Sequence, residues 1–119
     1  MKQIPQHRED GNLNDLQSFI TDLEPFQRKV DYWRVCIDEC IGPACAALEE
    51  LTEQSPRLSH IAFTSLCYSI TQTIDGVFEG YLADSLIVKL EAVDSTYWEI
   101  SSSVEFESYM VGKYGEFHG

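Results

Sequence analysis

The sequence predicts one α+β domain, with helices in its first half and an antiparallel sheet in its second half. Apolar residues recur at helical spacing as far as Leu51, which indicates helices that bury one face. From Gly76 the apolar residues fall at every second position instead, as they do in strands with one buried face. The chain has 119 residues, of which 44% are hydrophobic, and this suits a single domain with its own core.

The first residues of the chain are polar. We expect residues 1–12 to be a flexible segment ahead of a single domain over residues 13–119. A first helix is predicted after Asn12, which can cap it. Its apolar stripe consists of Leu13, Leu16, Ile20 and Leu23.

A second helical stripe follows Pro25, which suits the first turn of a helix. The stripe consists of Phe26, Val30, Trp33, Ile37, Ile41, Ala44, Leu48 and Leu51. Gly42 and Pro43 interrupt it, and proline inside a helix removes a backbone hydrogen bond and clashes with the preceding turn. We therefore expect a kinked helix, or two helices that meet at Gly42.

Ser55 and Pro56 form a start signal for another helix, because serine caps helices and proline fits their first position. The apolar face of this helix would hold Leu58, Ile61, Ala62, Leu66 and Ile70. Residues 65–74 also fit a period of two and are rich in β-branched side chains. They therefore belong either to this helix or to a further strand.

Three strands are predicted from Gly76 onward, in the segments GVFEGYL, LIVKLEAV and YWEIS. The short connections Ala83–Ser85 and Asp94–Thr96 make them a meander. A short C-terminal helix follows, with Ser102 and Glu105 as a capping box and Gly115 as its end. The expected fold is a set of N-terminal helices packed on a three- or four-stranded antiparallel meander, with the last helix at the side.

Counting through the two connections assigns alternate residues to opposite faces of the meander. The predicted core face holds Phe78, Gly80, Leu82, Leu86, Val88, Leu90, Ala92, Trp98 and Ile100. On the other face Glu79 lies opposite Lys89, and Glu91 lies opposite Glu99, which is destabilising because the charges are alike. That face also holds the apolar and aromatic residues Val77, Tyr81, Ile87, Val93 and Tyr97.

Aromatic residues beside acids are typical of protein-binding patches. The candidate partner-binding residues are therefore Glu79, Tyr81, Glu91, Tyr97 and Glu99. The alternative is that this is an ordinary solvated face, or a face that the first helices cover. A third interpretation is a homodimer interface, since Val77, Ile87 and Val93 lie on the same face.

The four cysteines are Cys36, Cys40, Cys45 and Cys67. The N-terminal stretch lacks the apolar middle of a signal peptide, so we expect free thiols, most of them in the core. Their spacing differs from that of structural zinc ligands, and no metal is expected. Asp75, Asp84 and Asp94 likewise lack the spacing of an EF-hand and are interpreted as turn residues.

No catalytic set stands out in the sequence. His60 could serve as a base for Cys67, but seven residues along a helix separate the two side chains by about two turns. Phosphate-binding, dinucleotide-binding and hydrolase motifs are absent from the sequence. The sequence therefore predicts a protein that is not an enzyme and has no cofactor.

The net charge is −12, from 20 acidic and 8 basic residues. This argues against binding to nucleic acids or anionic membranes, which need cationic surfaces. It favours rapid encounter with a basic protein partner. No apolar run reaches the roughly 18 residues that span a bilayer, and together with the lack of a signal peptide this predicts a cytoplasmic protein.

The segment QTIDGVFEGYLADSLIVKLEAVDSTYWEISSSVEFESYMVGKYG, residues 72–115, resembles small cytoplasmic immunity proteins of bacteria. The likeness lies in a strand with D-G-x-F, a strand with the acid-rich end L-E-A-V-D-S, then Y-W-E-I and a short helix. Such proteins neutralise toxins, including those of contact-dependent growth inhibition systems. The resemblance implies an inhibitor that binds a cognate toxin domain, often a basic nuclease, and it assigns no individual residue.

Two other functions remain open at this point. An acidic DNA mimic would inhibit a nucleic-acid-binding protein, but it needs rows of carboxylates, and here aromatic and basic residues lie among the acids. A small ligand-binding domain or enzyme would need a pocket between helices and sheet. The leading expectation is an immunity protein whose partner is a toxin with a basic surface.

Overall fold

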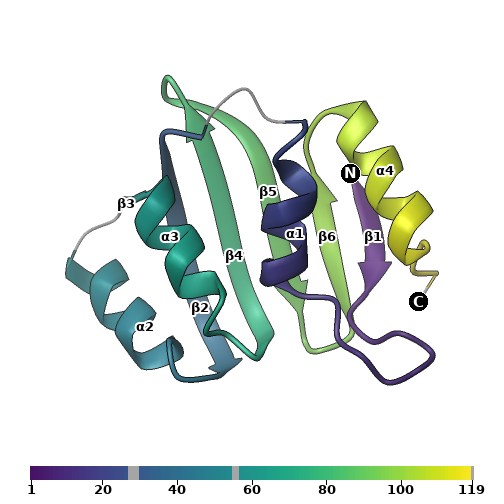
Figure 1. Cartoon of the computed structure of the whole chain (residues 1–119), viewed down its shortest axis with the longest axis horizontal. Helices are drawn as coiled ribbons and strands as arrows, with labels where there is room; N and C mark the ends of the chain where they lie inside the picture. The colour runs from purple at the N-terminus through teal and green to yellow at the C-terminus, as the bar shows by residue number, and fades with distance from the viewer. Residues whose placement is uncertain (27–29, 55–56, 119) are drawn as a thin grey trace.

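The structure is a computed structural model that describes residues 1–26, 30–54 and 57–118, and it confirms the α+β class. The described residues form four helices and one six-stranded antiparallel sheet with the strand order β1-β6-β5-β4-β2-β3 (Figure 1). The strands are β1 (Lys2–Pro5), β2 (Tyr32–Ile41), β3 (Leu58–Ser59), β4 (Gln72–Leu82), β5 (Ser85–Val93) and β6 (Tyr97–Ser101). The helices are α1 (Leu16–Leu23), α2 (Cys45–Gln54), α3 (His60–Cys67) and α4 (Val104–Tyr114).

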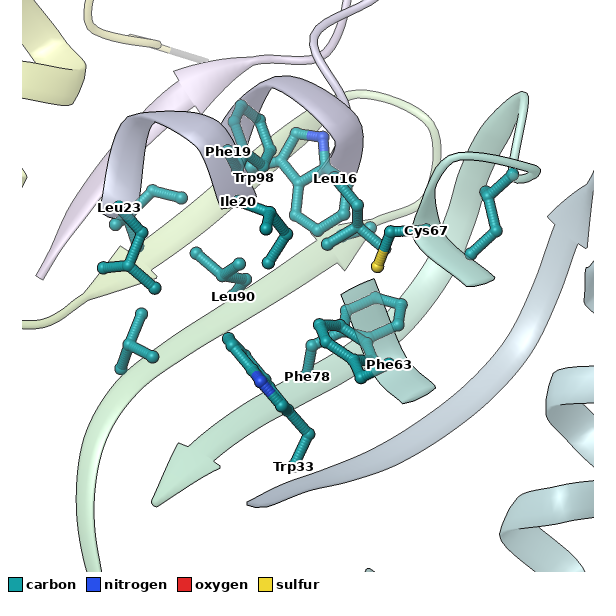
Figure 2. Packing of buried hydrophobic residues seen from close by; sticks show 14 of the residues in the cluster. Leu16, Phe19, Ile20, Leu23, Trp33, Phe63, Cys67, Phe78, Leu90 and Trp98 are labelled. Carbon is teal, nitrogen blue, oxygen red and sulfur yellow. The ribbon is translucent and has the colours of Figure 1, made fainter. Parts of the chain in front are cut away.

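The helices α1 and α3 lie across one face of the sheet, α4 lies beside β1, and α2 lies beside β2 at the opposite end (Figure 1). The core fills the space between the sheet and α1 and α3 (Figure 2). There Phe19 of α1 meets Trp98 of β6 edge-on at 5.0 Å, and Phe63 of α3 stacks on Trp33 of β2 at 4.3 Å. No helix of the described residues is long and apolar enough to cross a membrane.

The three predicted strands form the meander β4–β5–β6 with most of the predicted register, but the sheet has six strands and not the three or four expected. Glu79 pairs with Lys89, and Glu91 pairs with Glu99, as counting predicted. The first connection differs, because it has two residues, Ala83 and Asp84, with φ of 50° and 64°. Such a turn matches the right-handed twist of the two strands, and a bulge after Gly80 absorbs the shifted residue.

The prediction of a helix that includes Trp33 and Ile37 is wrong, because residues 32–41 form strand β2. Trp33, Val35 and Ile37 also alternate with a period of two, and in the sheet Trp33 pairs with Gly80. A Cβ on Gly80 would lie 3.2 Å from the Trp33 ring, so the glycine makes room for the indole. Burial against a distant strand therefore outweighs a local helical pattern.

Gly42 ends strand β2 rather than kinking a helix. Its φ is 137°, which favours glycine, and a Cβ there would lie 2.6 Å from the backbone of both Ser69 and Thr71. The chain then turns, and α2 begins at Cys45. Of the predicted stripe, Trp33, Ile37 and Ile41 thus lie on a strand, and Leu48 and Leu51 lie on a helix. Phe26, Val30 and Ala44 lie outside both elements.

The expected flexible segment over residues 1–12 contains strand β1. Its Ile4 is fully buried, and β1 pairs with β6 at the edge of the sheet. The backbone N–H of Phe117 donates to the carbonyl of Gln3 from the other side. This strand was missed because one apolar residue beside a proline gives no local sign of pairing with β6.

The helix start predicted at Ser55 and Pro56 lies outside the described residues. In the structure α3 begins at His60, and the Ser59 hydroxyl caps it by accepting a hydrogen bond from Ala62 at 3.1 Å. Each alternative for residues 65–74 is right in part, since α3 runs to Cys67 and β4 starts at Gln72.

The first and last helices also differ slightly from prediction at their N-termini. Asp15 rather than Asn12 caps α1, and Ser103 rather than Ser102 caps α4. Glu107, not Glu105, accepts the hydrogen bond from the Ser102 N–H. The end of α4 at Gly115 is confirmed.

Candidate functional site

The helices leave one face of the sheet uncovered, and this open face carries the predicted partner-binding residues. By strand register the open face consists of Tyr32, Arg34 and Cys36 of β2, Val77, Glu79 and Tyr81 of β4, Lys89, Glu91 and Val93 of β5, and Tyr97, Glu99 and Ser101 of β6. The members from β4 to β6 are all half-buried. Of the alternatives left open by the sequence, the one in which the first helices cover this face is therefore excluded.

Two neighbouring rows of side chains differ in charge. In one row Arg34, Glu79 and Lys89 come from adjacent strands, so opposite charges alternate. In the next row Glu91 faces Glu99, and Lys89 Nζ lies 3.9 Å from Glu91 Oε1. Lys89 thus compensates the negative charge of the pair at Glu91, and Glu99 is the more weakly compensated of the two carboxylates.

An aromatic stack marks the corner where β2 meets β4. Tyr32 and Tyr81 stack nearly parallel, with ring centroids 5.0 Å apart. Arg57 lies over the Tyr32 ring at 4.4 Å, and Arg34 lies near the Tyr81 ring at 5.5 Å. The stack fixes two aromatic side chains on the open face, which lowers the entropy lost when a partner covers them.

The five predicted site residues fall into two groups. Glu91, Glu99 and Tyr97 lie together on β5 and β6, and Tyr97 also stacks on Phe117 at 4.9 Å. Glu79 and Tyr81 lie on β4 and share the other half of the face with β2. Arg34 and Tyr32 were missed as site residues because β2 was predicted to be a helix.

No protein-family model matches the chain. The curated proteins and the solved structures contain no significant match either. The use of the open face is therefore inferred from its own residues and charges.

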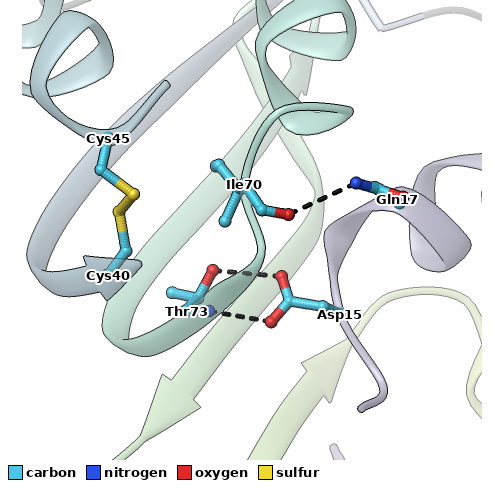
Figure 3. The surroundings of a disulfide bond; sticks show 6 residues. All are labelled: Asp15, Gln17, Cys40, Cys45, Ile70 and Thr73. Carbon is cyan, nitrogen blue, oxygen red and sulfur yellow. Dashed lines mark hydrogen bonds between the residues drawn. A yellow bond between two sulfur atoms is a disulfide. The ribbon is translucent and has the colours of Figure 1, made fainter. Parts of the chain in front are cut away.

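Two of the cysteines form a disulfide, which corrects the expectation of free thiols. Cys40, near the end of β2, is bonded to Cys45, the first residue of α2 (Figure 3). Cys36 is a free thiol on the surface and Cys67 is a buried one. No group of three potential metal ligands occurs among the described residues.

The pair of His60 and Cys67 lacks the properties of a nucleophile and its base. Burial raises the pKa of the Cys67 thiol far above its usual range, so it stays protonated. His60 uses Nδ1 to accept a hydrogen bond of 3.0 Å from Trp33 Nε1. Burial lowers the pKa of His60, and this keeps the imidazole neutral as the bond to Trp33 requires.

Asp15 is a buried carboxylate that joins α1 to strand β4. Its side chain accepts a hydrogen bond of 2.8 Å from the N–H of Leu16. It also accepts hydrogen bonds from the N–H of Thr73, at 2.8 Å, and from the Thr73 hydroxyl (Figure 3). Burial raises its pKa from 3.8 to about 6, against the effect of these hydrogen bonds. These hydrogen bonds join the start of α1 to β4, so Asp15 is a structural group.

A mainly apolar hollow opens where the β4–β5 hairpin meets the ends of α1 and β6. Its volume is about 500 Å³, and it is lined by Leu23, Phe26, Leu82, Leu86, Ile87, Val88, Ser101, Ser102 and Ser103. Leu86, predicted to lie in the core, is 47% exposed here, and Leu82 is half-buried. Ile87, predicted on the opposite face, is partly buried against the core, because the bulge shifts this end of the hairpin.

Proposed function

We propose that the protein is an immunity protein, which binds and neutralises a cognate bacterial toxin with a basic surface through the open face. The observation that carries the proposal is the uncovered row in which Glu91 faces Glu99 beside Tyr97. A like-charged pair has no structural use in a sheet, since it costs a few tenths of a kcal/mol up to about 1. A cation from a partner would remove this cost.

Charge and aromatic content both support a protein partner. The net charge of −12 attracts a basic protein over distance and speeds its encounter. Tyr81, Tyr97 and Tyr32 offer large side chains of low conformational entropy, which is the kind that dominates binding energy. The function proposed is binding and not catalysis, and its place is the cytoplasm, where the toxin would act.

The positions of the cations on the face make the proposal more specific. Arg34 and Lys89 reduce the excess of negative charge around Glu79, so this half of the face attracts cations less. Glu99 and Glu91 have less compensation. A toxin arginine or lysine is therefore expected to dock between Glu91 and Glu99, with the Tyr32–Tyr81 stack as an apolar contact at the side.

The test begins with capture of partners from the source cells by the tagged protein at low and high salt, followed by mass spectrometry. A captured protein must then prove toxic when expressed alone and harmless when co-expressed with this chain. The double variant Glu91→Lys/Glu99→Lys should lose both binding and protection. A matched control, Glu9→Lys/Glu50→Lys, changes net charge equally at exposed positions that do not belong to the open face and should retain both.

Two outcomes would contradict the proposal. If protection is lost equally in both double variants, overall charge and not the open face is responsible. If no captured protein is toxic, the immunity function is wrong.

The apolar hollow favours a second candidate function, that of a small ligand-binding domain. A volume of about 500 Å³ lies within the usual range for small-molecule sites, and apolar walls with a few hydroxyls are typical of them. Native mass spectrometry of the purified protein would reveal a bound small molecule. A ligand that is displaced by Leu86→Trp, a substitution at an exposed lining residue, would favour this candidate over the first.

A further inference from the structure

Strand β2 has a free edge. β4 pairs with it along its length on one side, whereas β3 pairs on the other side only with Tyr32 and Trp33. Among the described strands none pairs with that second edge from Arg34 to Ile41. Amide groups of successive residues in an antiparallel strand point to alternate sides, so every second residue here directs its N–H and C=O away from β4. Such an edge is a template for a further strand.

A groove runs along this edge between β2 and α2. Its volume is about 440 Å³, and it is lined by Val35, Cys36, Ile37 and Asp38 of the strand and by Glu49, Thr52 and Glu53 of the helix. Four consecutive residues of a strand point to opposite faces in turn, so they can line one groove only if it follows the strand's edge. A smaller hollow of about 220 Å³, lined by Arg34, Val35, Cys36, Thr52, Val77 and Glu79, continues it to the open face.

The position of α2 beside the edge is fixed at its start. The disulfide between Cys40 and Cys45 ties the end of β2 to the first turn of α2, and Leu48 of α2 is fully buried in the core. An edge beside a fixed helix is the arrangement in which a protein binds an extended peptide as an added strand. The bulges between Ile37 and Cys40 limit the straight part of the edge to a strand of about four or five residues.

The charge of the groove selects the peptide. Residues 35–56 contain five acids, Asp38, Glu39, Glu49, Glu50 and Glu53, and no lysine or arginine. Three of these acids line the groove. A second copy of this chain, paired through the same edge, would bring like charges together, which disfavours a homodimer here. A basic segment would instead place positive charges beside these acids, without that repulsion.

We propose that the groove between β2 and α2 binds an extended basic segment of a partner protein, which adds to β2 as a strand. Lysine or arginine at every second position of the segment reaches Asp38, Glu49 and Glu53, and the backbone pairs with the free edge of β2. This site borders the open face at Cys36 but lies along the edge of β2, and the proposal does not depend on whether the partner is a toxin.

The first test uses a fluorescent seven-residue peptide of alternating lysine and valine with blocked ends, and measures its binding by anisotropy. Two further peptides carry backbone N-methyl groups either on every lysine or on every valine. All three peptides have the same side-chain charges, but each methylated peptide lacks the N–H donors along one edge of its backbone. One of the two should bind at least about tenfold more weakly, a loss of about 1.4 kcal/mol, and the other should keep its affinity. Equal binding of all three peptides would overturn strand addition.

The second test uses variants of the protein. Glu49→Lys/Glu53→Lys changes two acids that line the groove, and Glu50→Lys/Glu116→Lys changes two exposed acids that do not. The first should weaken binding of the unmethylated peptide by about tenfold, and the second by no more than about twofold, because charge acts most strongly at contact. An equal loss in both would mean attraction to the whole acidic surface and would overturn the site.

A third measurement requires no substitution. The exposed thiol of Cys36 lines the groove, whereas the other free thiol, Cys67, is only 1% exposed. The bound peptide should slow alkylation of Cys36 by iodoacetamide. An unchanged rate at saturating peptide would place the peptide elsewhere and overturn the proposal.

Discussion

The β4–β5–β6 meander and the β2–α2 segment reach the same sheet in different ways. In the meander each strand pairs with the next one along the chain, through connections such as Ala83–Asp84. β2 pairs instead with β4, so that Trp33 meets Gly80, and α3 lies between them in the sequence. The strand pairing in the meander is therefore determined by residues close in the sequence. The position of β2 depends instead on burial and on a few specific long-range contacts.

The largest expected effect tests the burial of β2. Trp33 is fully buried, stacks on Phe63 and donates a hydrogen bond to His60. Trp33→Ala should lower the free energy of unfolding by about 3–5 kcal/mol, measured by urea denaturation. Ile61→Ala, at a position 77% exposed on α3, serves as control and should change it by less than about 0.5 kcal/mol. A small effect of Trp33→Ala would mean that β2 is not part of the core.

The next effect concerns the tie between α1 and β4. Burial raises the pKa of Asp15 from 3.8 to about 6, so between these values the folded state keeps a proton that the unfolded state has lost. The contribution of Asp15 to stability is therefore full below about pH 4 and is lost as the pH rises through 6, a change of about 3 kcal/mol. Urea denaturation from pH 4 to pH 7 should show a flatter profile for Asp15→Asn than for the natural chain. Parallel profiles would contradict the burial of this carboxylate.

A smaller effect is expected from the disulfide. Cys40 and Cys45 are only 5 positions apart, and closing so short a loop stabilises by roughly 2 kcal/mol in the chain-entropy relation. Cys40→Ser/Cys45→Ser should lower the free energy of unfolding by that amount and raise hydrogen exchange in α2. Cys36→Ser, at the free surface thiol, should leave both unchanged.

The smallest effect belongs to the meander. Glu99→Gln removes the repulsion from Glu91 and should stabilise the protein by a few tenths of a kcal/mol at low salt. Glu79→Gln removes a favourable partner of Lys89 and Arg34 and should destabilise it by a similar amount. Thermal denaturation in low and high salt measures both. If both substitutions change the stability in the same direction, the charges in the two rows do not interact as the strand register indicates.

The sequence was sufficient where structure depends on near neighbours. The meander, the Glu91–Glu99 pair, the buried faces of Trp98 and Leu90 and the end of α4 follow from alternation and turn residues. The five predicted site residues lie on one open face for the same reason. Which of them bind a partner stays a prediction.

The sequence was insufficient where distant segments meet. Trp33 and Ile37 satisfy both a helical and an alternating pattern, and only pairing with β4 decides between them. The disulfide could not be inferred, because Cys40 and Cys45 come into reach through the turn at Gly42. The groove beside β2 could not be predicted from the sequence for the same reason, since it exists only if residues 32–41 form a strand at the edge of the sheet.

The order of the strands has a consequence for synthesis on the ribosome. β1 and β2 leave the exit tunnel first, but their partners are β6 and β4, which are made later. Until β4 emerges, β2 has no strand with which to pair along its length. No strand pairing then competes with the helical pattern of its sequence. Strand β1 joins the sheet last, when β6 reaches it and Phe117 bonds to Gln3. Residues 97–117 must therefore have left the exit tunnel before this sheet can close.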